Sequence, residues 1–151
     1  MYLLHKEIEV DAPVGKVWAF ISHPKNLDRI TPDDMEFRIV TEVPECMYNG
    51  LLVEYRVRIP LMGWQVWVSE LKHIEPERYF VDEQKIGPYR FWYHEHRIET
   101  TGEKVKVIDH VSYEVPFGLV GRIAHSLFIR PTLERIFRHR EKMFQELLSA
   151  P

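Results

Sequence analysis

The residues best suited to chemistry are two histidines and an aspartate in two neighbouring segments of alternating pattern. Trp92, His94 and His96 share one parity, so an extended strand projects all three from the same face. Asp109 interrupts an otherwise apolar row of one parity in residues 105–115, and its neighbours in that row predict that it points inward. The pattern therefore predicts that an acid and two imidazoles meet in the protein interior.

A third segment brings another acid and an amide towards the same interior. Phe80, Asp82 and Gln84 share a parity in the strand segment that precedes the histidines. A buried carboxylate is costly unless it is paired or hydrogen-bonded, so an imidazole on an adjacent strand is the natural partner of Asp109. Arg140 falls on the apolar stripe of the C-terminal helical segment and is expected to turn inward, where it could answer one of the buried acids.

Four roles are open for this polar cluster. A His–Asp pair can join adjacent strands without any chemistry, and we expect this to be the main reason for these residues. The same groups can orient the polar end of a mostly apolar ligand. A His-x-His segment with a carboxylate also matches the ligand types of a zinc or iron site, and a tuned histidine can act as an acid or base. We expect no metal and no other cofactor.

Composition argues against several classes of function. The 151 residues carry 20 Lys and Arg against 23 Asp and Glu, a formal net charge of -3, so the chain has no overall positive field for nucleic acid or an anionic membrane. Cys46 is the single cysteine, which excludes an internal disulfide and a Cys-based zinc site and indicates a reducing compartment. The N-terminal segment is too polar for a signal peptide. We therefore expect a cytoplasmic protein without membrane insertion.

The hydrophobic periodicity predicts the elements that position these residues. We expect a first strand over 2–10, a short helix from Pro13 to Ile21 and a second helical piece over 26–30. A period of two then indicates an antiparallel meander with strands at 37–43, 51–61, 65–74, 78–86, 89–99 and 104–115. From Gly118 to Leu148 the spacing is helical, and Pro131 is expected to kink or divide that helix.

About seven strands that curve around one long helix define an α+β fold, and such a sheet tends to enclose a cavity. We expect a single domain over residues 1–151, with access to the cavity near residues 117–128. The expected wall of the cavity comprises Trp67, Phe80, Asp82, Gln84, Trp92, His94, His96, Asp109, Tyr113, Phe117, Leu127 and Arg140.

The order of elements and two sets of motifs resemble the START/Bet v 1-like helix-grip superfamily, also called SRPBCC, over the whole chain. The opening IEVDAP at 8–13 with VWAFI at 17–21 carries the general likeness. Gly87-Pro88, W-x-H-x-H at 92–96 and D-x-V-x-Y-x-x-P-F-G at 109–118 are similar to a bacterial branch of ligand-binding or cell-division-inhibitor-related SRPBCC proteins. The resemblance implies a helix-grip pocket for an apolar or amphipathic molecule. It does not imply one ligand, because the superfamily includes lipid carriers, hormone binders, polyketide cyclases and chaperone activators.

Three functions follow from these observations. The first, which we expect, is non-covalent binding of a small hydrophobic or amphipathic molecule in the cavity, as a carrier or a sensor. The second is a cyclase or dehydratase that uses His94 or His96 with Asp109 as a proton-transfer pair. The third is an interaction module, which requires an exposed apolar patch. The expected partner is a small hydrophobic molecule rather than nucleic acid, and the sequence does not set the oligomeric state.

Overall fold

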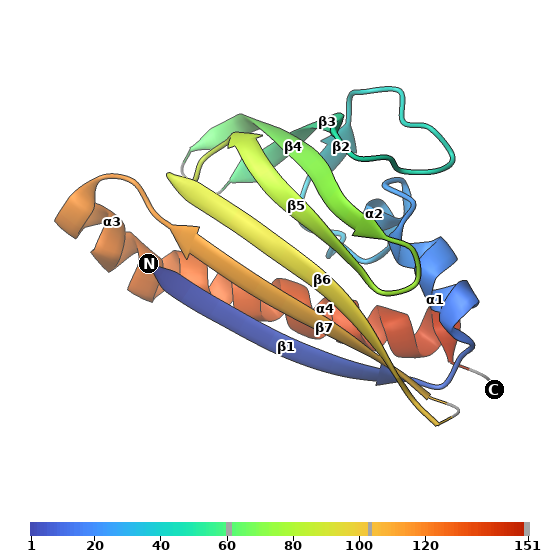
Figure 1. Ribbon diagram of the computed structural model, residues 1–151. Helices are drawn as coiled ribbons and strands as arrows, with labels where there is room; N and C mark the ends of the chain where they lie inside the picture. The colour runs from blue at the N-terminus through green and yellow to red at the C-terminus, as the bar shows by residue number, and fades with distance from the viewer. Residues whose placement is uncertain (60–61, 103, 150–151) are drawn as a thin grey trace.

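Seven antiparallel strands form one curved sheet that wraps around a long C-terminal helix in the computed structural model (Figure 1), which describes all residues except 60–61, 103 and 150–151. The spatial order is β1-β7-β6-β5-β4-β3-β2, so the first strand pairs with the last and the others follow as a meander. The strands are β1 Tyr2–Val10, β2 Phe37–Ile39, β3 Leu51–Ile59, β4 Gly63–Glu75, β5 Tyr79–Ile86, β6 Phe91–Thr101 and β7 Lys104–Glu114. The predicted α+β helix-grip architecture is confirmed.

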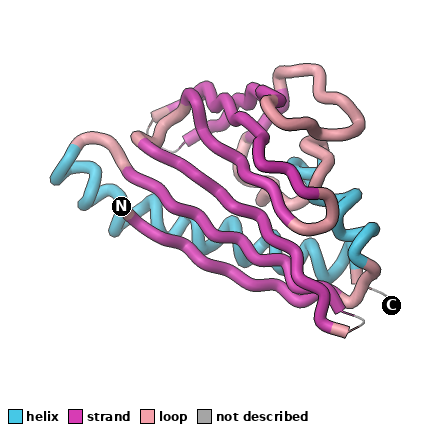
Figure 2. The backbone as a smooth tube through the Cα atoms, in the orientation of Figure 1, coloured by secondary structure: helices cyan, strands magenta, loops and turns pink. Residues whose placement is uncertain are grey.

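Two groups of helices flank the meander in the chain, and the second runs along the sheet (Figure 2). Two short ones, α1 Val14–Ile21 and α2 Asn26–Arg29, lie between β1 and β2. After β7 the chain forms α3 Gly118–Ala124, the π-helical segment η1 His125–Ile129 and α4 Arg130–Leu148. Pro131 stands in the first turn of α4, and because proline cannot donate to the preceding turn, the hydrogen-bond pattern changes just before it. Pro131 is expected from the sequence to kink or divide the helix; the helix instead runs from α3 to α4 without a break, and the change is one of hydrogen-bond pattern in η1.

Several strand boundaries differ from the sequence prediction by one to four residues. The second strand ends at Ile39 instead of continuing to residue 43. The sixth strand begins at Phe91 rather than at residue 89, because the Gln84 amide hydrogen-bonds the backbone N–H and carbonyl of Tyr89 and closes the turn between β5 and β6. The predicted end of the third strand, at 60–61, lies outside the described residues.

The parity prediction for the core is confirmed on β6 and β7. Trp92, His94 and Ile98 are buried on β6, and alternate residues from Val105 to Tyr113, Asp109 included, are buried on β7. One end of the interior is filled by aromatic rings from three strands and a turn, with neighbouring ring centroids 4.8–5.8 Å apart. We call this set the aromatic cluster; it consists of Trp67, Tyr89, Trp92 and Tyr113, and it packs against Leu133 and Phe137 of α4.

Candidate functional site

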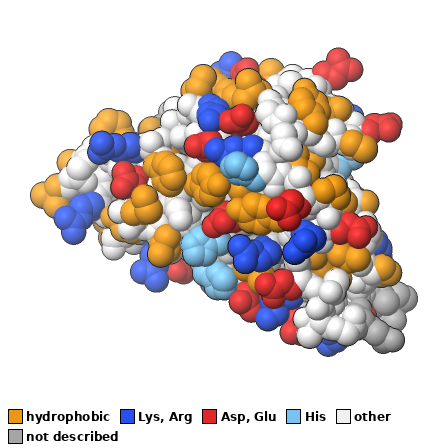
Figure 3. Space-filling model, viewed as in Figure 1, with side chains coloured by type: hydrophobic (Ala, Val, Ile, Leu, Met, Phe, Trp, Pro, Cys, Tyr) orange, Lys and Arg blue, Asp and Glu red, His pale blue; other side chains and the backbone are white. Residues whose placement is uncertain are grey.

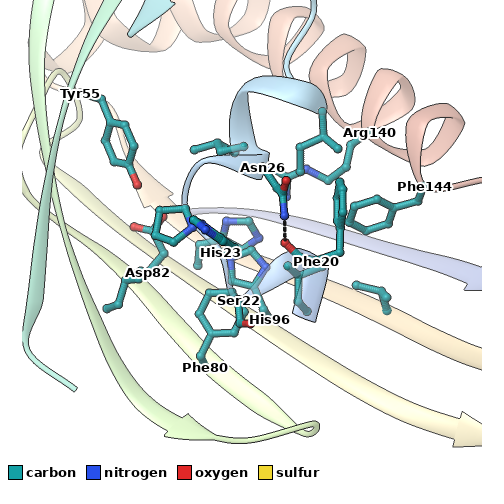
Figure 4. A pocket seen from close by; sticks show the side chains of 17 residues that line it. Phe20, Ser22, His23, Asn26, Tyr55, Phe80, Asp82, His96, Arg140 and Phe144 are labelled. Atoms are coloured by element: carbon teal, nitrogen blue, oxygen red, sulfur yellow. Dashed lines mark hydrogen bonds between the residues drawn. The ribbon is translucent and has the colours of Figure 1, made fainter. Parts of the chain in front are cut away.

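A small pocket of about 70 Å³ lies between the sheet, the α1–α2 segment and α4 (Figure 4). Its volume suffices for a few water molecules and is well below the roughly 300–1,000 Å³ of a site for a drug-sized ligand. Apolar side chains make up most of the wall, and polar side chains enter it both from the sheet with α4 and from the α1–α2 segment. The lining residues are Phe20, Ile21, Ser22, His23, Pro24, Asn26, Leu27, Ile30, Tyr55, Leu71, Phe80, Asp82, His94, His96, Val107, Arg140 and Phe144.

The polar groups of the sheet and α4 meet at one oxygen of Asp109. His94 Nε2 lies 2.7 Å from Oδ1, His96 Nδ1 lies 3.1 Å from it, and Arg140 Nη1 donates to it across 3.3 Å. Asp109 is 1% exposed, so this carboxylate is compensated entirely by protein groups and not by bulk water. The geometry joins β6, β7 and α4 at a single atom.

The strand register explains why these groups meet. His96 is directly opposite Asp109 in the β6–β7 pair, and His94 is two residues away on the same face. Across the other edge of β6, Asp82 pairs with His94 and Phe80 pairs with His96. The His96 ring stacks on Phe80 with centroids 4.1 Å apart, which fixes the imidazole plane against the pocket wall.

Burial and charge set the protonation of this cluster. Burial alone would raise the pKa of Asp109, but the Arg140 guanidinium and the hydrogen bonds from both imidazoles hold it well below its usual range. Burial, aided by His96, lowers the pKa of His94 to about 3, against the opposing effect of Asp109. His94 is therefore neutral at pH 7 and donates its Nε2–H to an ionised Asp109, whose charge Arg140 balances.

Asp82 is the second acid of the pocket and has a different environment. Burial raises the pKa of this carboxyl, and Ser69, His96 and Arg140 only partly oppose the shift. Among the described residues, Asp82 Oδ1 has no hydrogen-bond partner, and the same is true of Arg140 Nε and Asp109 Oδ2. Burial also raises the pKa of Tyr55, so its phenol remains protonated in the pocket wall. Asp82 and Arg140, which line the pocket, thus each carry a buried polar atom that no described protein group satisfies.

A cation is a poor fit for the cluster, although the ligand types would suit one. Ligand atoms of His94, His96 and Asp109 lie within 4.8 Å of one another. Both imidazole nitrogens facing Asp109 would have to release their protons to bind a metal. The guanidinium of Arg140, 3.3 Å from the shared oxygen, would then be adjacent to a second positive charge. The arrangement therefore fits an Asp109–Arg140 ion pair with two imidazole donors better than it fits a metal site.

The structure brings only part of the predicted site together. Phe80, Asp82, His94, His96 and Arg140 line the pocket, and Asp109 lies directly behind them. The ligand-binding role of all of them remains a prediction.

The remaining predicted wall residues lie elsewhere. Trp67, Trp92 and Tyr113 belong to the aromatic cluster, and Gln84 is engaged with the backbone of Tyr89. The Tyr113 hydroxyl lies 2.8 Å from His125 Nε2 and so fastens η1 to the sheet. None of these four residues lines the pocket, because their side chains pack against neighbouring rings or hydrogen-bond to backbone groups instead.

Phe117 and Leu127 require a correction. They are 74% and 62% exposed, and the segment 117–128, expected near the entrance, contributes nothing to the pocket lining. Helical spacing does not tell which side of a helix faces the sheet when both sides carry apolar residues, and here Gly121 and His125 are the buried ones.

Sequence reasoning missed the residues that close the pocket on the other side. Ser22 and His23 lie between α1 and α2, and Asn26 is the first residue of α2. The Asn26 side chain donates a hydrogen bond to the Phe20 carbonyl across 2.9 Å (Figure 4). A signal was present: His23-Pro24 separates the two short helices, and connecting segments often carry functional residues. Their position in the same pocket as residues of β5 and β6 depends on long-range packing that no local pattern encodes.

Solved structures define the class of fold. A START superfamily protein from Mycobacterium smegmatis is 14% identical, with a TM-score of 0.70 and coverage of 97% of this chain and 99% of that one. The Zhui aromatase/cyclase of a Streptomyces species is 16% identical, with a TM-score of 0.71 and coverage of 95% and 90%. A Chromobacterium violaceum protein is 9% identical, with a TM-score of 0.73 and full coverage of both chains. The chain has the START-like helix-grip fold of the SRPBCC class, as the motifs implied.

The chain belongs to the family described as "Domain of unknown function (DUF8410)", whose model matches residues 61–148. A search of curated protein sequences gives no significant match. The suggested cell-division-inhibitor-related branch remains a prediction. Among the described helices, none is long and apolar enough to cross a lipid bilayer.

The Asp109 network leads to a stability prediction. Asp109→Asn keeps the shape of the side chain but leaves the Arg140 guanidinium buried without a counter-ion, so we expect the free energy of unfolding to fall by about 3–5 kcal/mol. Denaturant unfolding measures this loss. Asp34→Asn, which removes the exposed partner of Arg135, is the control and should cost less than about 1 kcal/mol. Adding Arg140→Met to Asp109→Asn should recover part of the lost free energy of unfolding. If Asp109→Asn costs no more than Asp34→Asn, the proposed network is refuted.

The lowered pKa of His94 predicts a pH dependence of stability. Between the ordinary pKa of 6.5 and the folded value of about 3, the unfolded chain binds a proton that the folded chain does not, so acid destabilises the fold through this group. As the pH falls from 6.5 to 5, the free energy of unfolding of the wild type should decrease more steeply than that of His94→Gln, by up to about 1.4 kcal/mol per pH unit. The raised pKa of Asp82 acts with the opposite sign, but Asp82 is present in both proteins and largely cancels.

Unfolding curves at a series of pH values test this expectation. His5→Gln, which removes an exposed imidazole paired with Glu7 on β1, serves as the control, and its free energy of unfolding should stay within about 1 kcal/mol of the wild-type value over this pH range. Parallel curves for wild type and His94→Gln would show that His94 is not the group responsible.

Proposed function

We propose that this protein binds a small amphipathic molecule non-covalently, as a carrier or a sensor, in the pocket between α1–α2, the sheet and α4. The observation that carries the proposal is a largely apolar wall in which Asp82 and Arg140 each have one buried polar atom, Oδ1 and Nε, without a hydrogen-bond partner among the described residues. Pockets for small molecules combine an apolar lining with a few convergent polar groups. The START-like fold supports the same class of function without naming a ligand.

The polar groups favour a ligand with a neutral head such as a hydroxyl. A hydroxyl can donate to Asp82 Oδ1 and accept from an arginine N–H, whereas an anionic head would face the buried Asp109 and Asp82 carboxyls. The apolar part of the ligand would contact Phe20 and Phe144. Since the volume is about 70 Å³, a ligand of several carbon atoms requires the pocket wall to open. The four-residue helix α2 has no buried residue and can move outward, whereas Val17 and Phe20 hold α1 in the core.

The proposed compartment remains the cytoplasm, because the single, exposed cysteine Cys46 is suited to reducing conditions. The ligand would be a metabolite of that compartment and would co-purify with the protein when bound tightly. Native mass spectrometry of freshly purified protein is the direct way to find it.

Binding of phenol and toluene tests the proposal. The two probes have nearly the same size, and only phenol carries a hydroxyl, so we expect measurable binding of phenol by calorimetry and weaker binding of toluene. Leu27→Trp places a large ring at the pocket lining and should abolish phenol binding. Leu52→Trp, on the exposed face of β3, is the matched control and should bind as wild type does. Unchanged affinity in Leu27→Trp would place the binding site elsewhere and refute the proposal.

A second candidate function is acid–base catalysis of the cyclase or dehydratase type. One specific observation favours it: His96 lines the pocket, and its Nδ1 lies 3.1 Å from Asp109 Oδ1. This contact leaves His96 Nε2 available as a base towards a bound molecule. The structural likeness to an aromatase/cyclase is compatible with this reading. His94, neutral with its pKa near 3, would act as a positioning donor to Asp109 rather than as the base.

The two candidate functions are separated by removing both imidazoles. For a binding protein, His94→Gln with His96→Gln should retain most of the affinity for an apolar fluorescent probe, because apolar contact dominates affinity in such a wall. If the wild type turns over a polyketide-like substrate and the double variant does not while still binding the probe, the enzyme assignment replaces the carrier. His5→Gln controls for the loss of an imidazole outside the pocket.

A further inference from the structure

The beginning of the C-terminal helix carries its apolar side chains on the outside. Residues 117–128, which we call the apolar tip, comprise the end of the β7–α3 connection, α3 and most of η1. Six large apolar side chains in this segment are 55–74% exposed: Phe117, Leu119, Val120, Ile123, Leu127 and Phe128. Single exposed apolar residues are normal, but a contiguous set marks an interaction surface.

The inner face of the apolar tip is occupied by other residues, so the exposed face cannot turn inward. Gly121 is buried, and a Cβ atom there would lie 1.8 Å from the Pro116 carbonyl oxygen. His125 is stacked on Tyr2 with ring centroids 3.6 Å apart and bonded to Tyr113. This side therefore approaches the sheet closely, while Leu119, Ile123 and Leu127 form an i, i+4, i+8 stripe towards solvent.

Arg122 is the one residue of the Lys, Arg, Asp and Glu types within the apolar tip. Between Val115 and Leu133 the sequence contains two arginines and no acidic residue, although the whole chain has a net charge of -3. Arg130 pairs with Glu134 at 3.0 Å, and Glu114 lies 3.6 Å from the terminal amino group. Arg122 is exposed and has no ion-pair partner among the described residues. The surface therefore complements an anionic and apolar partner.

The shape of this region narrows the choice of partner. The apolar tip projects beyond the end of the sheet, at the opposite end from α1 and α2 (Figure 1), and apolar side chains lie beside Lys and Arg side chains there (Figure 3). A projecting end suits a flat interface better than a groove. A symmetric contact between two copies through the Leu119, Ile123 and Leu127 stripe would bring the two Arg122 side chains close together. Their like charges would oppose such a dimer.

We propose that the apolar tip adsorbs onto the surface of an anionic phospholipid bilayer. Apolar side chains such as Leu119, Ile123 and Phe128 would enter the boundary between headgroups and acyl chains, and Arg122 would contact lipid phosphates. The segment of 12 residues from 117 to 128 is too short to span a bilayer, which takes about 20 residues, so it lies in the interface and does not cross. This proposal does not depend on the pocket or its ligand.

Sedimentation with vesicles tests the docking. We expect the protein to bind vesicles of equal phosphatidylglycerol and phosphatidylcholine, to bind pure phosphatidylcholine much less, and to be released by raised salt. Leu119→Ser with Ile123→Ser should weaken binding more than about tenfold, because two apolar side chains no longer enter the interface. Arg122→Gln should weaken binding to anionic vesicles about fivefold and reduce the salt dependence.

Matched controls separate docking from general stickiness. Leu52→Ser and Ile86→Ser remove exposed apolar side chains outside the apolar tip and should leave vesicle binding unchanged. All these changes are at exposed positions, and circular dichroism verifies that the variants remain folded. Absence of binding to anionic vesicles overturns the proposal, as does an equal effect of the control variants. A dimer in sedimentation velocity that Leu119→Ser with Ile123→Ser dissociates would also overturn it, by assigning the surface to a second copy.

Discussion

The buried charge of Asp109 is the constraint on which the arrangement of the C-terminal helix depends. A carboxylate with 1% exposure cannot rely on water, and its Oδ1 atom accepts from β6 on one side and from α4 on the other. Arg140 reaches it only if α4 has one particular rotation and height against the sheet. The guanidinium also lies over the Phe137 ring, 4.7 Å from its centroid, which fixes its direction. Apolar packing alone would tolerate small shifts of α4 that this network does not.

The position of α4 then divides the interior into two different ends. Towards its first turns, the aromatic cluster packs against Leu133 and Phe137 and occupies the space between helix and sheet. Towards its last turns, Phe144 packs edge-on against Phe20 of α1, and the pocket remains between them and β5–β6. A large cavity along the whole helix is therefore replaced by a small one at one end. The same anchoring leaves the start of the helix, the apolar tip, outside the body of the protein.

Local pattern sufficed for the sheet and for the centre of the polar network. Alternation placed His94, His96 and Asp109 on inner faces, and helical spacing placed Arg140 inward, because one buried side per element leaves one possible orientation. The pattern was insufficient where both sides of an element carry apolar residues, as at Leu127, or where a polar side chain has a backbone partner, as Gln84 does. The contact of His23 and Asn26 with the pocket arises from tertiary packing, to which local periodicity is blind.

The polar cluster exceeds what a purely structural role requires. Joining β6 to β7 needs only Asp109 and one imidazole, and balancing the charge needs Arg140. Asp82 adds a second buried acid, whose pKa is raised by its surroundings and whose Oδ1 has no partner among the described residues. Such a group destabilises a fold unless it is satisfied from within the pocket. A water molecule or the polar end of a ligand that enters the pocket beside Asp82 would remove that penalty, and this energetic gain is the physical basis of the binding proposed above.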